Sequence, residues 1–173
     1  AYWINMSSVL ASAFTIILLY WSIVMLGRKV LKAKLGEETN FQKIMLAGAG
    51  AIGALAFTFT DSFWFSAVEG EVYAMSSFFT AIVFWAMLKW ELMSDESQAN
   101  KWLIFIAYMI GLSSGVHLLG LVTVPALALI YYFKNYKTIT VKNFILANVI
   151  SAAILLFIFK LLLPSSLQFF GWM

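Results

Sequence analysis

The residues of this sequence that are best suited to chemistry are three carboxylates and the only histidine. Asp61, Glu69 and Glu71 lie in one stretch that contains no lysine or arginine. Carboxylates in such a stretch can bind a divalent cation, accept a proton from a hydroxyl group as a general base, or hold a sugar hydroxyl. The alternative is that they are solvated acids near the start of a helix, where the helix dipole favours negative charge.

The spacing of these acids along the chain predicts the directions in which their side chains point. On a regular helix Glu69 and Glu71 would be about 200° apart and would point in different directions, whereas Glu69 and Tyr73 would share a face. Asp61 could cap a short helix that starts at Ser62. No spacing is diagnostic of a metal site, so no metal ligand is predicted, although a divalent cation stays a candidate cofactor for the acids.

The histidine, His117, lies within the sequence Gly-Leu-Ser-Ser-Gly-Val-His-Leu-Leu-Gly at 111–120. If it faces the same cavity as the acids, it could bind a phosphate group when protonated. A single histidine beside a helix turn can also be a structural residue that forms hydrogen bonds. The functional interpretation requires His117 and the acids to lie on the same side of the protein.

Membrane-spanning helices must position these residues, because the 173-residue chain is 63% hydrophobic and only 11% charged. A soluble domain is about half apolar and about a quarter charged. Stretches of roughly 20 apolar residues that could cross a bilayer occupy 3–26, 44–60, 72–92 and 144–163. Polar residues in the first stretch, Asn5 among them, are expected to contact other helices. The sequence has no cysteine, and no basic patch with interleaved aromatics indicates nucleic acid.

The stretch 103–133 allows two interpretations, one long tilted helix or two short helices. Gly115 and Gly120 weaken a continuous helix, and Pro125 fits best in the first turn of a new one. We therefore expect two short helices that meet near residues 114–121. The predicted fold is an all-α, polytopic transmembrane helical bundle with about six membrane segments.

Basic residues support this count, because cytoplasmic loops collect lysine and arginine. With two short helices, the segments 27–43, 89–102 and 134–143 lie on one side and hold ten of the eleven basic residues. A single long helix would place 134–143 on the other side. The ten are Arg28, Lys29, Lys32, Lys34, Lys43, Lys89, Lys101, Lys134, Lys137 and Lys142.

Two stretches of the sequence resemble a known family. Residues 63–80, which contain Val-Glu-Gly-Glu-Val-Tyr at 68–73, are similar to bacterial protein O-mannosyltransferase-like membrane proteins of the GT-C glycosyltransferase superfamily. The second match is 111–120, together with Pro-Ala-Leu-Ala-Leu at 125–129 and Tyr-Tyr-Phe-Lys at 131–134. The resemblance covers nearly the whole chain, and 68–73 is its most specific part.

The resemblance implies an enzyme that transfers a sugar, with mannose a candidate, from a polyprenyl-phosphate donor to a protein or glycan acceptor. It implies that Glu69 and Glu71 are catalytic and line the sugar or acceptor site, and that Asp61, Tyr73 and His117 bind substrate. His117 would approach the lipid-linked phosphate. It also implies a multi-pass protein in the bacterial inner membrane, in contact with membrane lipid. Residues 61–71 and 114–121 would then be periplasmic, and 27–43, 89–102 and 134–143 cytoplasmic.

The whole chain is expected to be part of one transmembrane domain and an internal fragment of a longer protein. The family's first helix, its first outer loop with the usual catalytic acid, and a C-terminal remainder would lie outside 1–173, so we expect the fragment to be inactive. Two alternatives stay open, a transporter or flippase and a non-catalytic assembly subunit. An acid in an outer loop before Ala1 would favour the enzyme.

Overall fold

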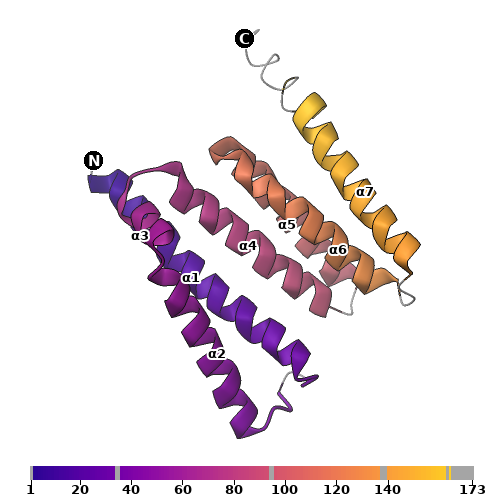
Figure 1. Ribbon diagram of the computed structural model, residues 1–173, viewed down its shortest axis with the longest axis horizontal. Helices are drawn as coiled ribbons and strands as arrows, with labels where there is room; N and C mark the ends of the chain where they lie inside the picture. Colours follow the sequence, from indigo (N-terminus) through magenta and orange to yellow (C-terminus); the bar gives the residue numbers. More distant parts are fainter. Residues whose placement is uncertain (1, 34–35, 94–95, 137–139, 163, 165–173) are drawn as a thin grey trace. The chain divides into compact units, whose positions relative to one another are not determined.

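A computed structural model describes residues 2–33, 36–93, 96–136, 140–162 and 164. All regular structure among these residues is helical, which confirms the all-α fold class. Lys34, Asp95, Lys137 and Leu163 lie outside the described residues. The α-helices are α1 (Tyr2–Val30), α2 (Asn40–Thr58), α3 (Asp61–Val68), α4 (Val72–Leu92), α5 (Glu96–Val116), α6 (Thr123–Asn135) and α7 (Val141–Phe157) (Figure 1). A 3-10 helix (Leu118–Val122) precedes α6 and a π-helix (Ile158–Leu162) follows α7.

Five of the described helical segments are long and apolar enough to cross a membrane. They are Tyr2–Val30, Asn40–Thr58, Val72–Leu92, Gln98–Val116 and Val141–Leu161. The chain is thus a multi-pass membrane protein. α6 has 13 residues and is about 20 Å long at 1.5 Å per residue. The expected break in 103–133 is present at 117–122, but α5 starts at Glu96 and is therefore long enough to span by itself.

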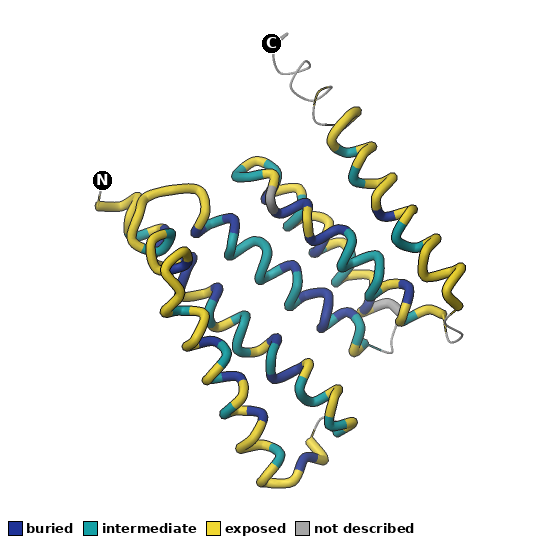
Figure 2. The backbone as a smooth tube through the Cα atoms, viewed as in Figure 1, coloured by how far each residue is buried: buried dark blue, intermediate teal, exposed yellow. Residues whose placement is uncertain are grey.

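The chain divides into two compact units, Ala1–Gly120 and Leu121–Met173. In the first unit α1 packs against α2 and α4, α5 packs against α4, and the short α3 lies against α1 (Figure 1). The fully buried side chains include Val83 and Met87 of α4 and Ile106 of α5. In the second unit α6 packs against α7, most of whose residues are exposed (Figure 2).

The contact between α1 and α2 is close because two glycines of α2 face α1. A Cβ atom at Gly50 would lie 2.9 Å from the Tyr20 ring and from Val24 Cγ2, and one at Gly53 would lie 2.7 Å from Ile23 Cδ1. Glycines that admit a neighbouring helix in this way are typical of membrane bundles, where van der Waals packing drives association. Polar residues of α1 are also buried by its neighbours, including Ser8, Ser12, Thr15 and Ser22.

Ion pairs join the helix ends at the 27–43 side of the first unit. Arg28 pairs with Glu38 in the loop before α2, and Lys29 pairs with Glu91 near the end of α4. A hydrogen bond from its own backbone amide, with others from Arg28 and Gly36, lowers the pKa of Glu38 against the opposing effect of burial. The Lys29–Glu91 pair shows that α1 and α4 end on the same side, as the predicted grouping of 27–43 with 89–102 requires.

Candidate functional site

Glu69, Gly70 and Glu71 form the connection between α3 and α4, which we call the acid turn. Both glutamates are exposed and have extended backbone conformations. The Glu69 backbone N–H donates to the Phe65 carbonyl at 3.0 Å and closes α3, while Glu71 is the N-cap of α4 without a capping side-chain hydrogen bond. The helix is interrupted here, so Glu69, Glu71 and Tyr73 do not lie on one regular helix, and the angular relations expected for such a helix do not apply.

Gly70 lies directly against the first turn of α1. A Cβ atom at Gly70 would be 2.7 Å from Asn5 Oδ1 and 2.8 Å from Ile4 Cγ2. Because contacts this short cannot be accommodated without movement, the lack of a side chain allows the acid turn to approach α1. Asn5 is exposed, and its side-chain amide lies against Gly70, the residue between the two glutamates. The sequence indicated only an interhelical contact for Asn5.

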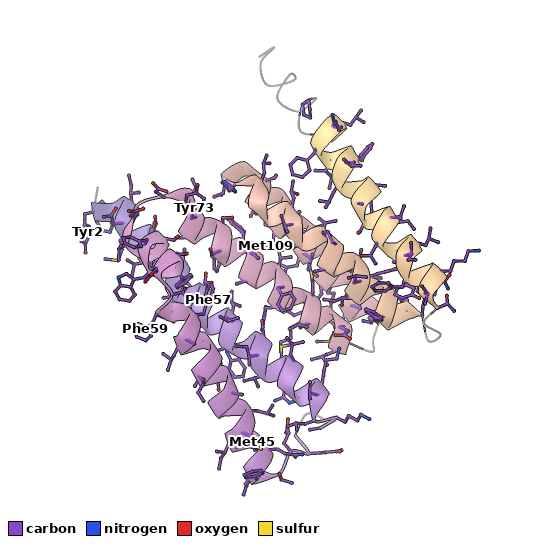
Figure 3. The ribbon with its side chains drawn as sticks, viewed as in Figure 1. Tyr2, Met45, Phe57, Phe59, Tyr73 and Met109 are labelled. Carbon is purple, nitrogen blue, oxygen red and sulfur yellow. The ribbon has the colours of Figure 1, made fainter. Side chains whose placement is uncertain are left out.

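Tyr73 and His117 meet at the same end of the first unit. Tyr73 lies in the first turn of α4, and its ring centroid is 5.6 Å from that of His117, with an interplanar angle of 49°. The His117 backbone N–H donates to the Ser113 carbonyl at 2.9 Å, which extends the hydrogen bonding of α5 to this residue. Figure 3 places Tyr2 and Tyr73 at one end of the unit and Met45 at the opposite end. The acids of the turn and His117 therefore lie on one side.

Asp61 is separated from this group. It is the first residue of α3, whose N-cap is Thr60, so the prediction that Asp61 caps a helix starting at Ser62 is wrong by one residue. The eight residues of α3 span about 12 Å at 1.5 Å per residue, which places Asp61 at the far end of α3 from Glu69. Its carboxylate lies in the first turn, where it interacts favourably with the helix dipole.

The turn that carries His117 folds back onto α5. A Cβ atom at Gly120 would overlap Ser113 Oγ and would lie 2.8 Å from Ser113 Cβ. Ser113 is 1% exposed, and its hydroxyl has no hydrogen-bond partner within the described part of the chain. The contact between Gly120, three residues after His117, and Ser113 therefore holds the turn that follows α5 against that helix.

An apolar hollow of about 110 Å³ lies between α1, α2 and α3. α3 forms one wall and leads directly into the acid turn. The hydroxyl of Ser12, in the wall formed by α1, is buried and has no partner among the residues described. The lining residues are Ser12, Ala13, Ile16, Thr58, Phe63, Trp64 and Ala67.

Within the described ranges, no group of three or more histidine, cysteine or acidic residues could hold a metal ion. A divalent cation at the acid turn would thus have two carboxylates from this chain, with water or substrate oxygens completing the six to eight ligands of Ca²⁺ or the six of Mg²⁺.

These features define a class of protein: a multi-pass helical membrane protein with an acidic turn and a histidine at one end of its bundle. The chain belongs to the family described as protein O-mannosyl-transferase TMEM260 N-terminal domain, whose family model matches residues 1–140. This match confirms the O-mannosyltransferase-like resemblance and includes the whole first unit. No curated protein and no solved structure matches the chain.

Proposed function

We propose that this protein is a membrane glycosyltransferase that transfers a sugar from a polyprenyl-phosphate donor to a protein or glycan acceptor, with mannose the first candidate sugar. The observation that carries the proposal is the family match over 1–140, which includes an exposed acid turn at the same end of the bundle as His117. Family membership supports glycosyl transfer in general. The lipid-linked donor is the part that the proposal adds.

In the proposed reaction an acceptor hydroxyl oxygen attacks C1 of the donor sugar. The bond between C1 and the phosphate oxygen breaks, and the phosphate leaves with the electron pair. Glu69 or Glu71 accepts the hydroxyl proton or holds a sugar hydroxyl, since both carboxylates are reachable from outside the bundle. His117 contacts the phosphate, and Tyr73 orients the imidazole through its ring contact. Asp61, at the far end of α3, would contact the acceptor.

The hollow between α1, α2 and α3, at about 110 Å³, has room for only a few carbon atoms, so it is assigned to the part of the donor's lipid chain next to the phosphate. Its lining is almost entirely apolar, and two of its three walls, α1 and α2, are helices long and apolar enough to cross a membrane. Because α3 runs from this hollow to the acid turn, a chain lying in the hollow would have its polar head at the turn. This arrangement separates the apolar part of the donor from the water-facing acids.

The proposed orientation places the acid turn outside and the 27–43 and 89–102 ends in the cytoplasm of a bacterial cell. The excess of basic residues at the latter ends supports it, as does the ion pair that brings the ends of α1 and α4 together. In the same scheme 114–121 is periplasmic and 134–143 is cytoplasmic, which requires the 13-residue α6 to cross the membrane in addition to the five longer helices.

The test is sugar transfer by the full-length protein in membranes supplied with a polyprenyl-phosphate-linked sugar. Glu69→Gln and Glu71→Gln should lower transfer, by about 100-fold or more for whichever acts as the general base, and His117→Ala should weaken use of the donor. Glu37→Gln changes an exposed acid at the opposite end of the first unit and should leave transfer unchanged. Unchanged transfer in all three site variants would refute the proposal.

A flippase is the second candidate, because α5 and α6 are separated by a turn that includes a 3-10 helix. Transporters often bind substrate at helices that are broken within the membrane. Movement of a lipid-linked sugar across vesicles, without transfer of the sugar to an acceptor, would favour this candidate over the enzyme.

A further inference from the structure

Asn5, in the first turn of α1, contacts the acid turn, although the two segments are far apart in the sequence. Its Oδ1 atom occupies the space in front of Gly70, where a Cβ atom would be only 2.7 Å away. Glu69 and Glu71 are the immediate neighbours of Gly70. We propose that Asn5 contacts the same ligand as these two glutamates. This inference rests on the proposed function, since the ligand is the sugar substrate.

Hydrogen-bonding chemistry explains what Asn5 would add to the site. Ionised carboxylates only accept hydrogen bonds, whereas a side-chain amide provides two N–H donors and one acceptor. A sugar hydroxyl donates one hydrogen bond and accepts others. Glu69 and Glu71 can accept from hydroxyl groups, but they cannot donate to the sugar oxygens. Asn5 supplies the donors that the acid turn lacks.

Exposure is the second reason for this assignment. Asn5 and both glutamates are exposed, so a ligand approaching from outside the bundle can reach all three. Ser7, the next polar residue along α1, donates its hydroxyl to the Ile4 carbonyl at 2.7 Å and is therefore engaged by its own helix. The other residues at the start of α1 are Tyr2, Trp3 and Ile4; Tyr2 and Trp3 each offer a single O–H or N–H donor, whereas the amide of Asn5 offers two donors and one acceptor.

Gly70 makes this arrangement possible and provides a second way to test it. A methyl group at Gly70 would displace Asn5 Oδ1 and also meet Ile4 Cγ2 at 2.8 Å. The asparagine end can rotate away, but the isoleucine is β-branched and stiff. Gly70→Ala should therefore move the amide away from the ligand without deleting it.

The experiment measures kcat and KM for sugar transfer by the full-length protein. Asn5→Asp keeps the shape of the side chain but removes both donors and adds a negative charge beside the two glutamates. Asn5→Leu keeps the approximate size of the side chain and removes the donors without adding charge. Each should lower kcat/KM by about tenfold, the effect of losing a good hydrogen bond to substrate. Gly70→Ala should lower it similarly. The thermal midpoint of the Asn5 variants in detergent should stay at the wild-type value.

The matched control is Asn148→Leu on α7, which removes an amide that donates to the Phe144 carbonyl of its own helix at 2.8 Å. This variant should transfer sugar normally.

Normal kcat/KM in Asn5→Asp would overturn the inference, because a residue that only fills space tolerates an isosteric change. A lower kcat/KM in Asn5→Leu together with a lower thermal midpoint would also overturn the inference, because it would indicate that Asn5 has a packing role. If Glu69→Gln and Glu71→Gln abolish transfer while Asn5→Asp does not, the inference fails and the proposed function stands. If the glutamate and His117 variants all transfer normally, both fail.

Discussion

Among the glycines of the first unit, Gly120 is the one at which an added Cβ atom would make the closest contact. The added methyl group would overlap Ser113 Oγ and come within 2.8 Å of Ser113 Cβ. Rotation of the serine side chain can move Oγ, but it cannot move Cβ, which is fixed to the backbone of α5. The turn from His117 to Gly120 must therefore shift away from α5.

The expected cost follows from known effects of overpacking. Inserting a methyl group into a well-packed site costs about 1–3 kcal/mol, and Ser113 is 1% exposed, so little room is available for relaxation. For a chain of this size, each kcal/mol lowers the thermal midpoint by about 2–4 °C. Gly120→Ala should thus lower the midpoint by roughly 2–12 °C.

Thermal unfolding of the purified protein in detergent measures this shift. Gly111→Ala and Gly115→Ala are matched controls on α5, because no described atom lies within 4 Å of a Cβ at either position. Alanine is a better helix former than glycine by about 1 kcal/mol, so both controls should be neutral or stabilising. Ser113→Ala should also be neutral or stabilising, because the buried hydroxyl that it removes has no hydrogen-bond partner among the described residues.

A midpoint for Gly120→Ala equal to that of the two glycine controls would refute the proposed contact between the turn and α5. Rescue provides a further check. Ser113→Gly removes both atoms that the new methyl group would meet, so the double variant Ser113→Gly with Gly120→Ala should recover part of the lost stability.

Two further predictions concern the two ends of the first unit. Tyr73→Ala should lower the free energy of unfolding by about 0.5–1.5 kcal/mol beyond the loss of buried area, because it removes the ring contact with His117. Tyr73→Phe keeps this contact and should be neutral. Equal thermal midpoints for the two variants would count against the contact. The lowered pKa of Glu38 stabilises the folded state above the ordinary glutamate pKa of about 4.3, and this contribution is lost as the pH falls through the lower folded-state pKa. The thermal midpoint of the wild type should therefore fall more steeply below about pH 4.3 than that of Glu38→Gln, with Glu37→Gln as the exposed control; parallel pH profiles for the wild type and Glu38→Gln would contradict the assignment.

Periodic and compositional signals predicted most of the fold. The span at 72–92 coincides with α4, and Pro125 lies in the first turn of α6 as expected. The predicted helix ends were less accurate than the predicted helices, because polar residues continue a helix beyond its apolar part. α2 starts at Asn40 because Thr39 and Gln42 form a capping box. This signal was present in the sequence as a threonine followed three residues later by a glutamine.

The candidate site was only partly predictable. Charge placed the acids and His117 on one side, and the contact between Tyr73 and His117 agrees with that placement. The roles of Gly70 and Asn5 were not accessible, because they depend on a close approach between segments far apart in the chain. No local pattern encodes such an approach. The interruption of the helix at the acid turn has the same origin, since Gly70 accommodates α1 there.

The ion pair between Lys29 and Glu91 joins positions that are 62 residues apart, and this separation has a consequence for biosynthesis. At a synthesis rate of about 5–20 residues per second, Glu91 is made roughly 3–12 s after Lys29. During that interval the end of α1 can pair with the loop before α2, through Arg28 and Glu38, but not with α4. The hairpin of α1 and α2 is therefore the first assembly available to the nascent chain, and the Lys29–Glu91 pair marks the later arrival of α4.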